Sequence, residues 1–481
     1  MPANLIVKQL TVKTDQNRPQ QCLNSTQLFA CFASQPWAML LDSANCDHVD
    51  SRFDIMVAKP RVKIICQHQQ TQIIENQQSS YSLSDPLLIV QQQIDRVIKI
   101  KTNPTHLPFI GGAVGYFGYD LGASFEVLDK NALDDINTPD MAVGIFDWAI
   151  IKDNHQQTLW FVSQGPSLQS VAPEFVAYCQ TRHINPTPPF AITCDWQANM
   201  DFNAYTTKFN QVQQYLLSGD CYQINLAQRF TAHFKGDEYN AYCLLRETNK
   251  APFSAFLRFE DYAVVSISPE RLLQLNGSHI QTKPIKGTAV RSTDPEQDAK
   301  NAQQLSQSPK DRAENVMIVD LLRNDIGKVS VAGSVKVPSL FAIESFPAVH
   351  HLVSTVTGEL DKQYRACDLL RSAFPGGSIT GAPKIRAMQI IDQLEPHRRS
   401  VYCGSIGYIC ASGNMDTSIT IRTLVCQRDE TGNKIHCWAG GALVADSLVD
   451  SEYQETYDKV NKILPVLSVT YSESGVDSIH E

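Results

Sequence analysis

The sequence lacks any apolar run close to the ~20 residues that a membrane-spanning helix requires. Its first residues show no secretory signal with a basic start, an apolar core and a small-residue cleavage site. The 13 cysteines are scattered and never spaced C-x-x-C, so neither structural zinc nor a disulfide framework is expected. These absences predict a protein of the reducing cytoplasm with no membrane as partner.

Positive charge is also in deficit. The chain of 481 residues has 41 Lys and Arg against 50 Asp and Glu, a net charge of -9. This balance argues against nucleic acid as a partner, although it allows a local basic site. Two phosphate-binding signatures are missing as well, the P-loop and a G-x-G-x-x-G in a βαβ context. With 43% hydrophobic and 19% charged residues, the composition is that of an ordinary globular protein.

Proline divides the chain. The run Asn185-Pro186-Thr187-Pro188-Pro189 marks a linker. We predict an N-terminal region at 1–180, a linker at 181–201, a larger domain at 202–466 and a tail at 467–481. Hairpin-like spacing between the later strand patterns favours antiparallel pairing. The expected fold is α+β, with mostly antiparallel sheets packed in a layered sandwich and helices on the outside, as one large composite domain.

Hydrophobic periodicity and helix-start signals predict the individual elements. The expected strands are 37–41, 53–57, 262–267, 401–409, 417–424 and 434–438, and the expected helices are 86–97, 205–218, 310–324, 385–394 and 452–464. The glycine-dense stretch 111–120 is best explained by close packing of backbones, and Ala439-Gly440-Gly441-Ala442 is predicted to be a turn.

The segment 281–288 (QTKPIKGT) holds Lys286 between two stiff or special neighbours. Pro284 fixes a backbone angle, and Gly287 allows a left-handed turn directly after the lysine. We expect Lys286 at a strand end. It can be a solvated charge, a fixed cation for an anionic ligand, or a nucleophile with a lowered pKa, and the segment alone does not choose among the three.

Carboxylates gather on two predicted helices. Glu452, Glu455 and Lys459 share one helix face at spacings of three and four, and Glu314 lies on a helix whose second half is apolar almost all round. Hard oxygen ligands of this kind suit Mg²⁺. An exposed Glu–Lys ladder and a buried ion pair of Glu314 are the alternatives.

Single residues elsewhere have two readings each. Arg422 can clamp a carboxylate with its fork or form a structural ion pair. Glu270 can act as a general acid or can pair with its neighbour Arg271. His350 and His351 face opposite ways on a strand, so at most one of them points into a site. The glycine-rich loop 374–384 opens a helix, where free backbone N–H groups favour an anion.

Taken in order, these segments resemble the chorismate-utilising enzymes. The matching motifs are 219–226 (GDCYQINL), 268–271 (SPER), 284–288 (PIKGT), 311–325, 376–384 (GGSITGAPK) and 452–459. The match runs from about residue 202 to 464, and the preceding region resembles the N-terminal part of anthranilate synthase component I.

The resemblance implies a reaction. Anthranilate synthases have alanine where this chain has Lys286, and a lysine there is typical of the branch that makes 4-amino-4-deoxychorismate for 4-aminobenzoate and folate synthesis. In that branch the lysine attacks C2 of chorismate, the C4 hydroxyl leaves with a proton from the residue matching Glu270, and ammonia then adds at C4. Isochorismate synthases have a water-activating lysine where this chain has Gln223, so water addition at C2 is disfavoured.

The resemblance also implies ligands. Mg²⁺ is expected on Glu314 and Glu455, with Glu452 alongside, where it would hold the ring carboxylate of the substrate. Arg422 and Tyr408 are expected to hold the enolpyruvyl carboxylate. The other residues expected to bind the substrate are Gln223, His351, Thr380, Gly440, Gly441 and Lys459.

Two partners follow from the resemblance. No G-x-C-x-G nucleophile elbow is present, so a separate glutamine amidotransferase subunit is expected to deliver ammonia in a heterodimer. A pocket for tryptophan is expected at Ser43, Asp50, Ser51, Arg52, Phe53, Pro252, Phe253 and Ser254, unless these stretches are only core strands. Anthranilate synthase component I and a non-catalytic chorismate- or tryptophan-binding protein are the competing readings.

Overall fold

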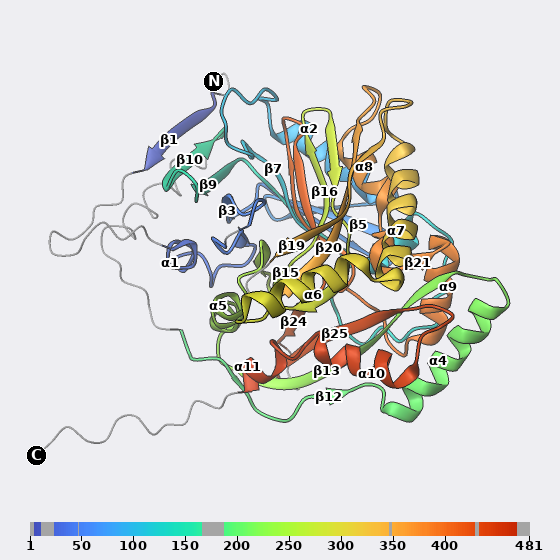
Figure 1. Ribbon diagram of the computed structural model, residues 1–481. Coiled ribbons are helices and arrows are strands. Elements are labelled where there is room, and N and C mark those ends of the chain that lie inside the picture. Colours follow the sequence, from blue (N-terminus) through green and yellow to red (C-terminus); the bar gives the residue numbers. More distant parts are fainter. Residues whose placement is uncertain are drawn as a thin grey trace, which may run out of the picture.

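The computed structural model describes residues 4–10, 24–46, 48–165, 187–345, 349–428 and 432–468. Within these ranges the chain forms two large antiparallel sheets, one of 13 strands and one of 12, with helices around them (Figure 1). The predicted α+β fold of layered antiparallel sheets is confirmed. None of the helices in these ranges is long and apolar enough to cross a bilayer.

The larger sheet takes strands from both halves of the chain. In spatial order it contains β1 (Ile6–Leu10), β10 (Thr158–Ser163), β9 (Trp148–Asp153), β3 (Phe53–Val57), β2 (Met39–Asp42), β14 (Phe253–Arg258), β15 (Tyr262–Ser268), β24 (Thr423–Gln427), β25 (Lys434–Leu443), β13 (Gln223–Lys235) and β11 (Ala191–Ile192). Two short strands, β12 (Gln197–Ala198) and β21 (Gly381–Ala382), also pair with β13.

The smaller sheet is built in the same way. Its order is β18 (Ile285–Val290), β20 (Val349–Glu359), β17 (His279–Thr282), β16 (Arg271–Asn276), β23 (Met415–Ile419), β22 (Ser405–Cys410), β7 (Gly112–Phe117), β8 (Met141–Phe146), β4 (Val62–Gln67), β5 (Gln70–Glu75) and β6 (Gln78–Ser82), with β19 (Lys336–Ser345) also on β20. The boundaries predicted for 1–180 and 202–466 stay predictions, but strands from both regions lie in each sheet.

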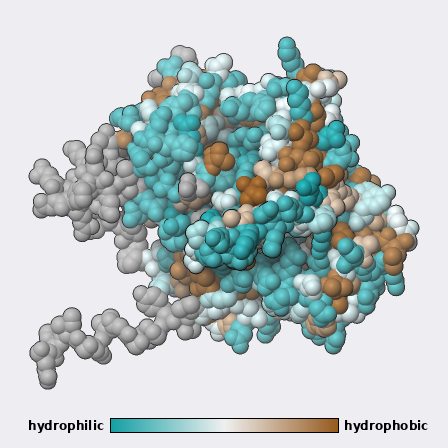
Figure 2. Space-filling model, viewed as in Figure 1, coloured by the Kyte–Doolittle hydropathy of each residue, from teal (hydrophilic) through white to brown (hydrophobic). Residues whose placement is uncertain are grey.

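The α-helices in the described ranges are α1 (Ser25–Phe29), α2 (Pro86–Val97), α4 (Phe202–Leu217), α5 (Glu238–Asn249), α6 (Pro295–Gln307), α7 (Pro309–Gly327), α8 (Ala366–Ala373), α9 (Lys384–Leu394), α10 (Val449–Asp458) and α11 (Leu464–Ser468). Short 3₁₀ turns lie at Tyr119–Ser124 and Gly377–Ile379. Helix α7 begins as predicted, with the Ser308 hydroxyl accepting from the N–H of Asp311 and Pro309 in the first turn. Helices α6 and α7 contact β18 and β20, and α6 turns a hydrophilic side to solvent (Figure 2).

Alternation along the strands buries both faces of the larger sheet. Met39 and Leu257 belong to the core between the sheets, whereas their neighbours Leu40 and Phe256 belong to a second core on the outer face. Residues of α1, α5 and α11 complete that second core. Since successive side chains point to opposite faces, a strand buried on both sides appears in the sequence as a continuous apolar run.

The predicted strand 417–424 is wrong as a single element. Strand β23 ends at Ile419 in the smaller sheet, and β24 begins at Thr423 in the larger one. The chain crosses between the sheets at Arg422, which has a left-handed φ of 51°. No glycine or proline marks this bend, so the two strand patterns run together in the sequence.

Other boundaries also differ. The run 439–442 is part of β25 and not a turn, because a Cβ at Gly440 would lie 2.5 Å from the carbonyl oxygen of Leu226 on the paired strand β13. The strand predicted at 401–409 begins only at Ser405. The helix predicted at 452–464 is two helices, α10 and α11. Of the linker 181–201, only the part from residue 187 is described, and it pairs with β13; the tail beyond 468 lies outside the described residues.

Candidate active site

Lys286 is the second residue of β18, close to the strand end that the sequence predicts. The register between β18 and β20 shifts between Ile285 and Thr288, and Gly287 has a φ of 78°. This is the geometry of a β-bulge with glycine in the left-handed region, which re-aims a neighbouring side chain. A Cβ at Gly287 would also approach Asp311 of α7 to 2.8 Å. The glycine after Lys286 is therefore required both by the bulge and by the close approach of α7.

The surroundings of Lys286 shift its pKa toward the neutral amine. Burial lowers the pKa of Lys286, and the carboxylates of Glu314 and Glu270 only partly oppose it. The Nζ atom donates a hydrogen bond of 3.0 Å to the carbonyl oxygen of Ser378. A lysine with a lowered pKa is a better nucleophile, because only the neutral amine has a free lone pair.

Glu270 precedes β16 and is 5% exposed. Burial raises the pKa of Glu270 to about 7, against the effect of Lys286. Its Oε1 accepts hydrogen bonds from the Ser378 hydroxyl at 3.1 Å and the Ile285 N–H at 3.5 Å. The alternative that Glu270 pairs with Arg271 is wrong, since Arg271 points to the other side of the strand and binds Asp416. A carboxyl group with a pKa near 7 can supply a proton at neutral pH.

The glycine-rich loop of residues 376–380 joins these two groups through Ser378. Thr380, fully buried in the same loop, donates its hydroxyl to the carbonyl of Gly376 at 3.1 Å. Gln223 at the start of β13 is also fully buried, and its Oε1 has no hydrogen-bond partner. The amide of Gln223 reaches only Asn225, at 3.5 Å. An unpaired buried acceptor is costly, so Gln223 has an unused hydrogen-bonding position in this structure.

The three predicted metal carboxylates come from α7 and α10. Glu452 is 2% exposed; its Oε1 accepts from Ser447 at 2.7 Å, and its Oε2 has no hydrogen-bond partner. Burial raises the pKa of Glu314 and of Glu452. Against the effect of burial, Lys459 holds the pKa of Glu455 below its usual value, through an ion pair of 2.6 Å. The Glu–Lys ladder thus exists for Glu455 and Lys459, while Glu452 is buried.

Lysines stand near these carboxylates. Lys310 of α7 lies 3.7 Å from Glu452 Oε1, and Lys459 also donates to the carbonyl of Gly440 at 2.7 Å. A Cβ at Gly441 would lie 3.1 Å from Glu452 Oε2 and 3.5 Å from Glu455 Oε1, so both carboxylates face the glycine backbone of β25. In the part of the chain that the structure describes, no three His, Cys, Asp or Glu side chains are already gathered as a metal site.

Arg422 and His351 lie near the same centre. Burial lowers the pKa of Arg422, and Glu270 opposes this. Burial and then Arg422 lower the pKa of His351 to about 4, so its imidazole is neutral at pH 7. The Nδ1 atom of His351 lies 2.9 Å from the Thr288 hydroxyl. His350 faces the opposite way toward Asp298, as the alternation along a strand predicts.

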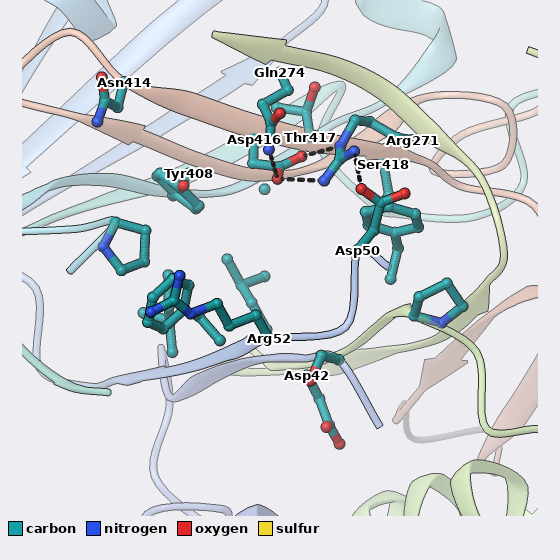
Figure 3. Close-up of a pocket in the computed structure, with 18 of the residues that line it drawn as sticks. Asp42, Asp50, Arg52, Arg271, Gln274, Tyr408, Asn414, Asp416, Thr417 and Ser418 are labelled. Atoms are coloured by element: carbon teal, nitrogen blue, oxygen red, sulfur yellow. Dashed lines mark hydrogen bonds and ion pairs between the residues drawn. The ribbon is translucent and has the colours of Figure 1, made fainter. Parts of the chain in front are cut away.

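Tyr408 does not accompany Arg422. Thr420 hydrogen-bonds Gly404, which lies just before β22, whereas Tyr408 within β22 lies opposite Asp416 of β23. Tyr408 is thus four residues along the strand from Gly404, a distance of roughly 13 Å at the usual rise per residue. Tyr408 instead lines a second cavity (Figure 3). The shared grip of Tyr408 and Arg422 on one carboxylate, which the resemblance implied, is therefore wrong, because β22 carries Tyr408 away from the point where the chain crosses between the sheets at Arg422.

This second cavity has a volume of about 590 Å³ and is lined from both halves of the chain. Its walls include Ser43, Asp50, Arg52, Phe53, Pro252, Phe253 and Ser254, which are seven of the eight residues predicted to bind tryptophan. The eighth, Ser51, donates its hydroxyl to the carbonyl of Ser43 at 2.7 Å. The two stretches are thus more than core strands, since they line a cavity.

Charges in the second cavity are matched by short contacts. Arg271 binds Asp416 at 2.9 Å and Asp50 at 2.6 Å, and Figure 3 shows its guanidinium between the two carboxylates. Arg52 lies over the ring of Phe53, with 4.4 Å between Cζ and the ring centre. The cavity walls therefore hold aromatic and charged groups side by side.

Two residues of the candidate active site, Ser378 and Lys310, were not predicted from the sequence. The loop 374–384 was expected to bind an anion, but only Thr380 was singled out, whereas Ser378 bonds both Lys286 and Glu270. Lys310, one turn before Glu314 on α7, faces Glu452. The i, i+4 spacing of Lys310 and Glu314 was the available signal.

Comparison with known proteins agrees with this geometry. The family described as chorismate binding enzyme matches residues 38–465, and the chain belongs to that family. Aminodeoxychorismate synthase component 1 of Escherichia coli (strain K12) is 54% identical over 439 residues, 91% of this chain and 95% of the relative. Anthranilate synthase component 1 of Aquifex aeolicus (strain VF5) is 35% identical over 403 residues, 81% of this chain and 80% of the relative.

A solved structure supports the fold. The crystal structure of anthranilate synthase component I from Streptococcus pneumoniae TIGR4 has a TM-score of 0.76 and 30% identity, and the match covers 87% of this chain and 93% of that chain. The layered sheets described above are therefore shared with an anthranilate synthase, and fold alone does not separate the two activities.

Proposed function

We propose that the chain is an aminodeoxychorismate synthase component I, which converts chorismate and ammonia to 4-amino-4-deoxychorismate. One observation carries the proposal: Ser378 joins a lysine of lowered pKa to a carboxyl group whose pKa is about 7. Lys286 replaces the alanine of anthranilate synthases. The identity of 54% to the Escherichia coli aminodeoxychorismate synthase, against 35% to the Aquifex anthranilate synthase, supports the same choice.

The chemistry follows from the two groups. The lone pair of neutral Lys286 forms a bond to C2 of chorismate, both ring double bonds shift by one position, and the C4–O bond breaks. Glu270 gives its proton to the departing oxygen, which leaves as water. Ammonia then adds at C4, the C2–N bond breaks with its electron pair returning to Lys286, and the Glu270 carboxylate takes the surplus proton. One hard displacement becomes two easier ones, and both residues are regenerated.

Arg422 is suited to hold a carboxylate of the substrate. Its guanidinium is only partly exposed and lies close enough to Glu270 to feel its charge, and a cation held away from water without a close partner is unfavourable. A substrate carboxylate would supply that partner, and the planar fork of Arg422 could bind it with two hydrogen bonds. The proposed substrate site also includes His351, Thr380, Gln223 and the glycines of β25.

Mg²⁺ belongs to the proposal. The oxygen donors of Glu314, Glu452 and Glu455 suit this hard cation, and the Oε2 of buried Glu452, which has no hydrogen-bond partner, supports the proposal because a cation would satisfy it. Lys310 and Lys459 supply the positive charge there now. When bound, Mg²⁺ would offset the charge of the substrate ring carboxylate.

A glutamine amidotransferase subunit is the proposed source of ammonia, and "component 1" in the relatives' names implies a second component. We place the heterodimer in the cytoplasm, in line with free thiols at every described cysteine. The chain alone should use ammonium and not glutamine. Glutamine-dependent turnover by the pure single chain would contradict a separate glutaminase.

Tryptophan is the proposed ligand of the second cavity. Phe53 and Pro252 offer faces for an indole ring. The Ser43 hydroxyl donates to Asp54 at 2.6 Å and accepts from Asn154 at 3.1 Å, which leaves one lone pair for an ammonium group.

The test of the activity is direct. Chorismate, Mg²⁺ and ammonium are incubated with the chain, with and without an aminodeoxychorismate lyase, and the products are identified by mass. We expect 4-amino-4-deoxychorismate alone and 4-aminobenzoate with the lyase. Fluorescent anthranilate would instead identify an anthranilate synthase, and no product at all would favour a binding protein.

A further inference from the structure

The two carboxyl oxygens of Glu270 have unequal partners. Oε1 accepts from the Ser378 hydroxyl at 3.1 Å and from the Ile285 N–H at 3.5 Å. Oε2 receives no hydrogen bond from the described residues. A backbone N–H can only donate, so a proton on Oε1 would face another proton. When Glu270 is neutral, its proton therefore belongs on Oε2.

The carbonyl oxygen of Ser378 restricts the orientation of the Lys286 amine. It accepts from Lys286 Nζ at 3.0 Å and from Asn225 Nδ2 at 3.2 Å, which uses both lone pairs of a carbonyl oxygen. A neutral amine has two N–H groups and one lone pair. One N–H directed at Ser378 restricts where the lone pair of Lys286 can point.

The loop that carries Ser378 is held from both sides. A Cβ at Gly377 would lie 2.4 Å from Leu321 of α7, so the loop backbone lies directly against that helix. On the other side, the buried guanidinium of Arg399 donates to the carbonyl of Ile379 at 2.9 Å. Ser378 therefore has a fixed place from which to orient its two partners.

We infer that Ser378 is a positioning residue of the reaction. Its hydroxyl keeps the proton of Glu270 on Oε2, free for the leaving hydroxyl, while its carbonyl aims the Lys286 amine. One residue thereby sets the geometry of the acid and of the nucleophile together, as preorganised catalysis requires. The inference rests on the proposed synthase activity.

A pH profile separates this role from simple packing. The charged groups that act on Glu270 are Lys286, Lys459 and Arg422, and all three remain when Ser378 is replaced. The Ser378 hydroxyl stabilises the carboxylate form, so its removal raises the pKa of Glu270. A general acid works only while protonated, and the alkaline limb of kcat should move to higher pH.

The experiment compares Ser378→Ala with Ser378→Cys, which keeps a similar shape but donates weakly. The control is Ser278→Ala, whose hydroxyl donates to a surface carboxylate, that of Glu359, at 2.7 Å. For both Ser378 variants we expect kcat to fall about tenfold, the value of one hydrogen bond. KM for chorismate should change less than about twofold, because the lost contact acts on the acid and not on the substrate. The control should match the wild type.

The outcomes are distinguishable. If the wild type makes no 4-amino-4-deoxychorismate from ammonium, the proposed function fails. If the wild type is active and both Ser378 variants keep its kcat and alkaline limb, the positioning role is overturned. It is equally overturned if kcat falls but the limb does not move, since that is the signature of packing. Should the alanine variant not fold, as judged by circular dichroism, the cysteine variant decides alone.

Discussion

Glu270 and Arg271 are neighbours in the chain and face two different sites. On the side of Glu270 the charges are unmatched: burial displaces the pKa of Glu270 and of Lys286 toward their neutral forms. On the side of Arg271 they are matched: against the effect of burial, Asp416 and Asp50 raise the pKa of Arg271 and keep it charged. Groups whose pKa values are displaced can exchange protons, whereas groups held in ion pairs stay charged and only form the wall of the cavity.

The same contrast between matched and unmatched charges is found between Lys283 and Lys286, which are three residues apart on one segment. Lys283 pairs with Glu344 at 2.7 Å and with Asp50 at 3.2 Å, so its charge is matched by carboxylates, one of which lines the second cavity. Lys286 donates to a neutral carbonyl instead. Two lysines of one segment therefore have different partners, carboxylates for one and a neutral carbonyl for the other. Substituting each lysine in turn compares them directly.

The largest effect is expected from Lys286→Ala, with Lys283→Ala as its matched control. Without the nucleophile the covalent route is closed, and ammonia-dependent activity should fall at least roughly a thousandfold. Lys283→Ala should stay within about threefold, because the ion pairs of Lys283 run to Glu344 and Asp50 and not to Lys286 or Glu270. Activity with ammonium and intact mass measure both variants. Wild type held without ammonia should gain an adduct at Lys286; an adduct elsewhere, or an active Lys286→Ala, would remove the nucleophile from the mechanism.

Glu270→Gln should have the next largest effect, because glutamine cannot give up a proton. We expect kcat to fall about a hundredfold or more, with Glu359→Gln on the surface as an unaffected control. In the wild type kcat should decline as pH rises through about 7, the pKa of Glu270. An unchanged pH profile in an active Glu270→Gln variant would assign the acid to another group.

The same substitution also tests stability. The folded pKa of about 7 lies above the usual 4.5, so the folded state binds more protons than the unfolded state between these values. The free energy of unfolding therefore falls as pH rises through that window, and the loss is complete above about 7. Glu270→Gln removes this loss, so it should melt above the wild type at pH 8 and close to it at pH 4. A melting point below the wild type at pH 8 would contradict the buried neutral acid.

How far the sequence predicts this molecule differs between fold and site. Local signals define single elements well: Ser308 and Pro309 start α7, and apolar runs mark β2 and β3. They do not tell which sheet a strand joins, because that depends on contacts between distant segments. Strands β23 and β24 were predicted as one strand for this reason, and the place of Tyr408 in the second cavity likewise follows only from the folded chain.

At the active site the motifs identify the residues that the chemistry needs, and the fold supplies their support. Lys286 and Glu270 are 16 positions apart in a pattern that the family shares, so a motif can identify them. Ser378 meets them from 92 and 108 residues away, across a contact that no local pattern contains. The pKa values depend on burial in the same way and follow only from the folded chain.

A smaller effect is expected at the carboxylates. Glu314→Gln and Glu455→Gln each remove a charge from the proposed Mg²⁺ site, so the Mg²⁺ concentration at half-maximal activity should rise about tenfold. Glu296→Gln, on the exposed side of α6, is the control and should not change it. A Mg²⁺ titration of activity makes the measurement. Unchanged half-saturation in both site variants would mean that these glutamates serve only the lysines beside them.

The smallest effect should come from the second cavity, and it concerns binding and not turnover. Its volume of about 590 Å³ is ample for one amino acid with an indole ring, and its walls combine aromatic faces with fixed charges of both signs. Tryptophan bound there would stabilise the folded state, because a ligand that binds only the folded chain shifts the unfolding equilibrium. We expect released tryptophan, detected by mass, when the purified protein is denatured.

Added tryptophan should raise the melting temperature by about 3 °C at saturating concentration. Phe53→Ala removes one face of the cavity and should abolish most of that shift while leaving kcat within about twofold, because Phe53 lines the second cavity together with Arg271, whereas Glu270 does not line it. If neither release nor a shift is seen, the cavity does not bind tryptophan. If Phe53→Ala lowers kcat as strongly as the active-site variants do, the two sites are not separate in function, and the contrast between matched and unmatched charges no longer divides the molecule.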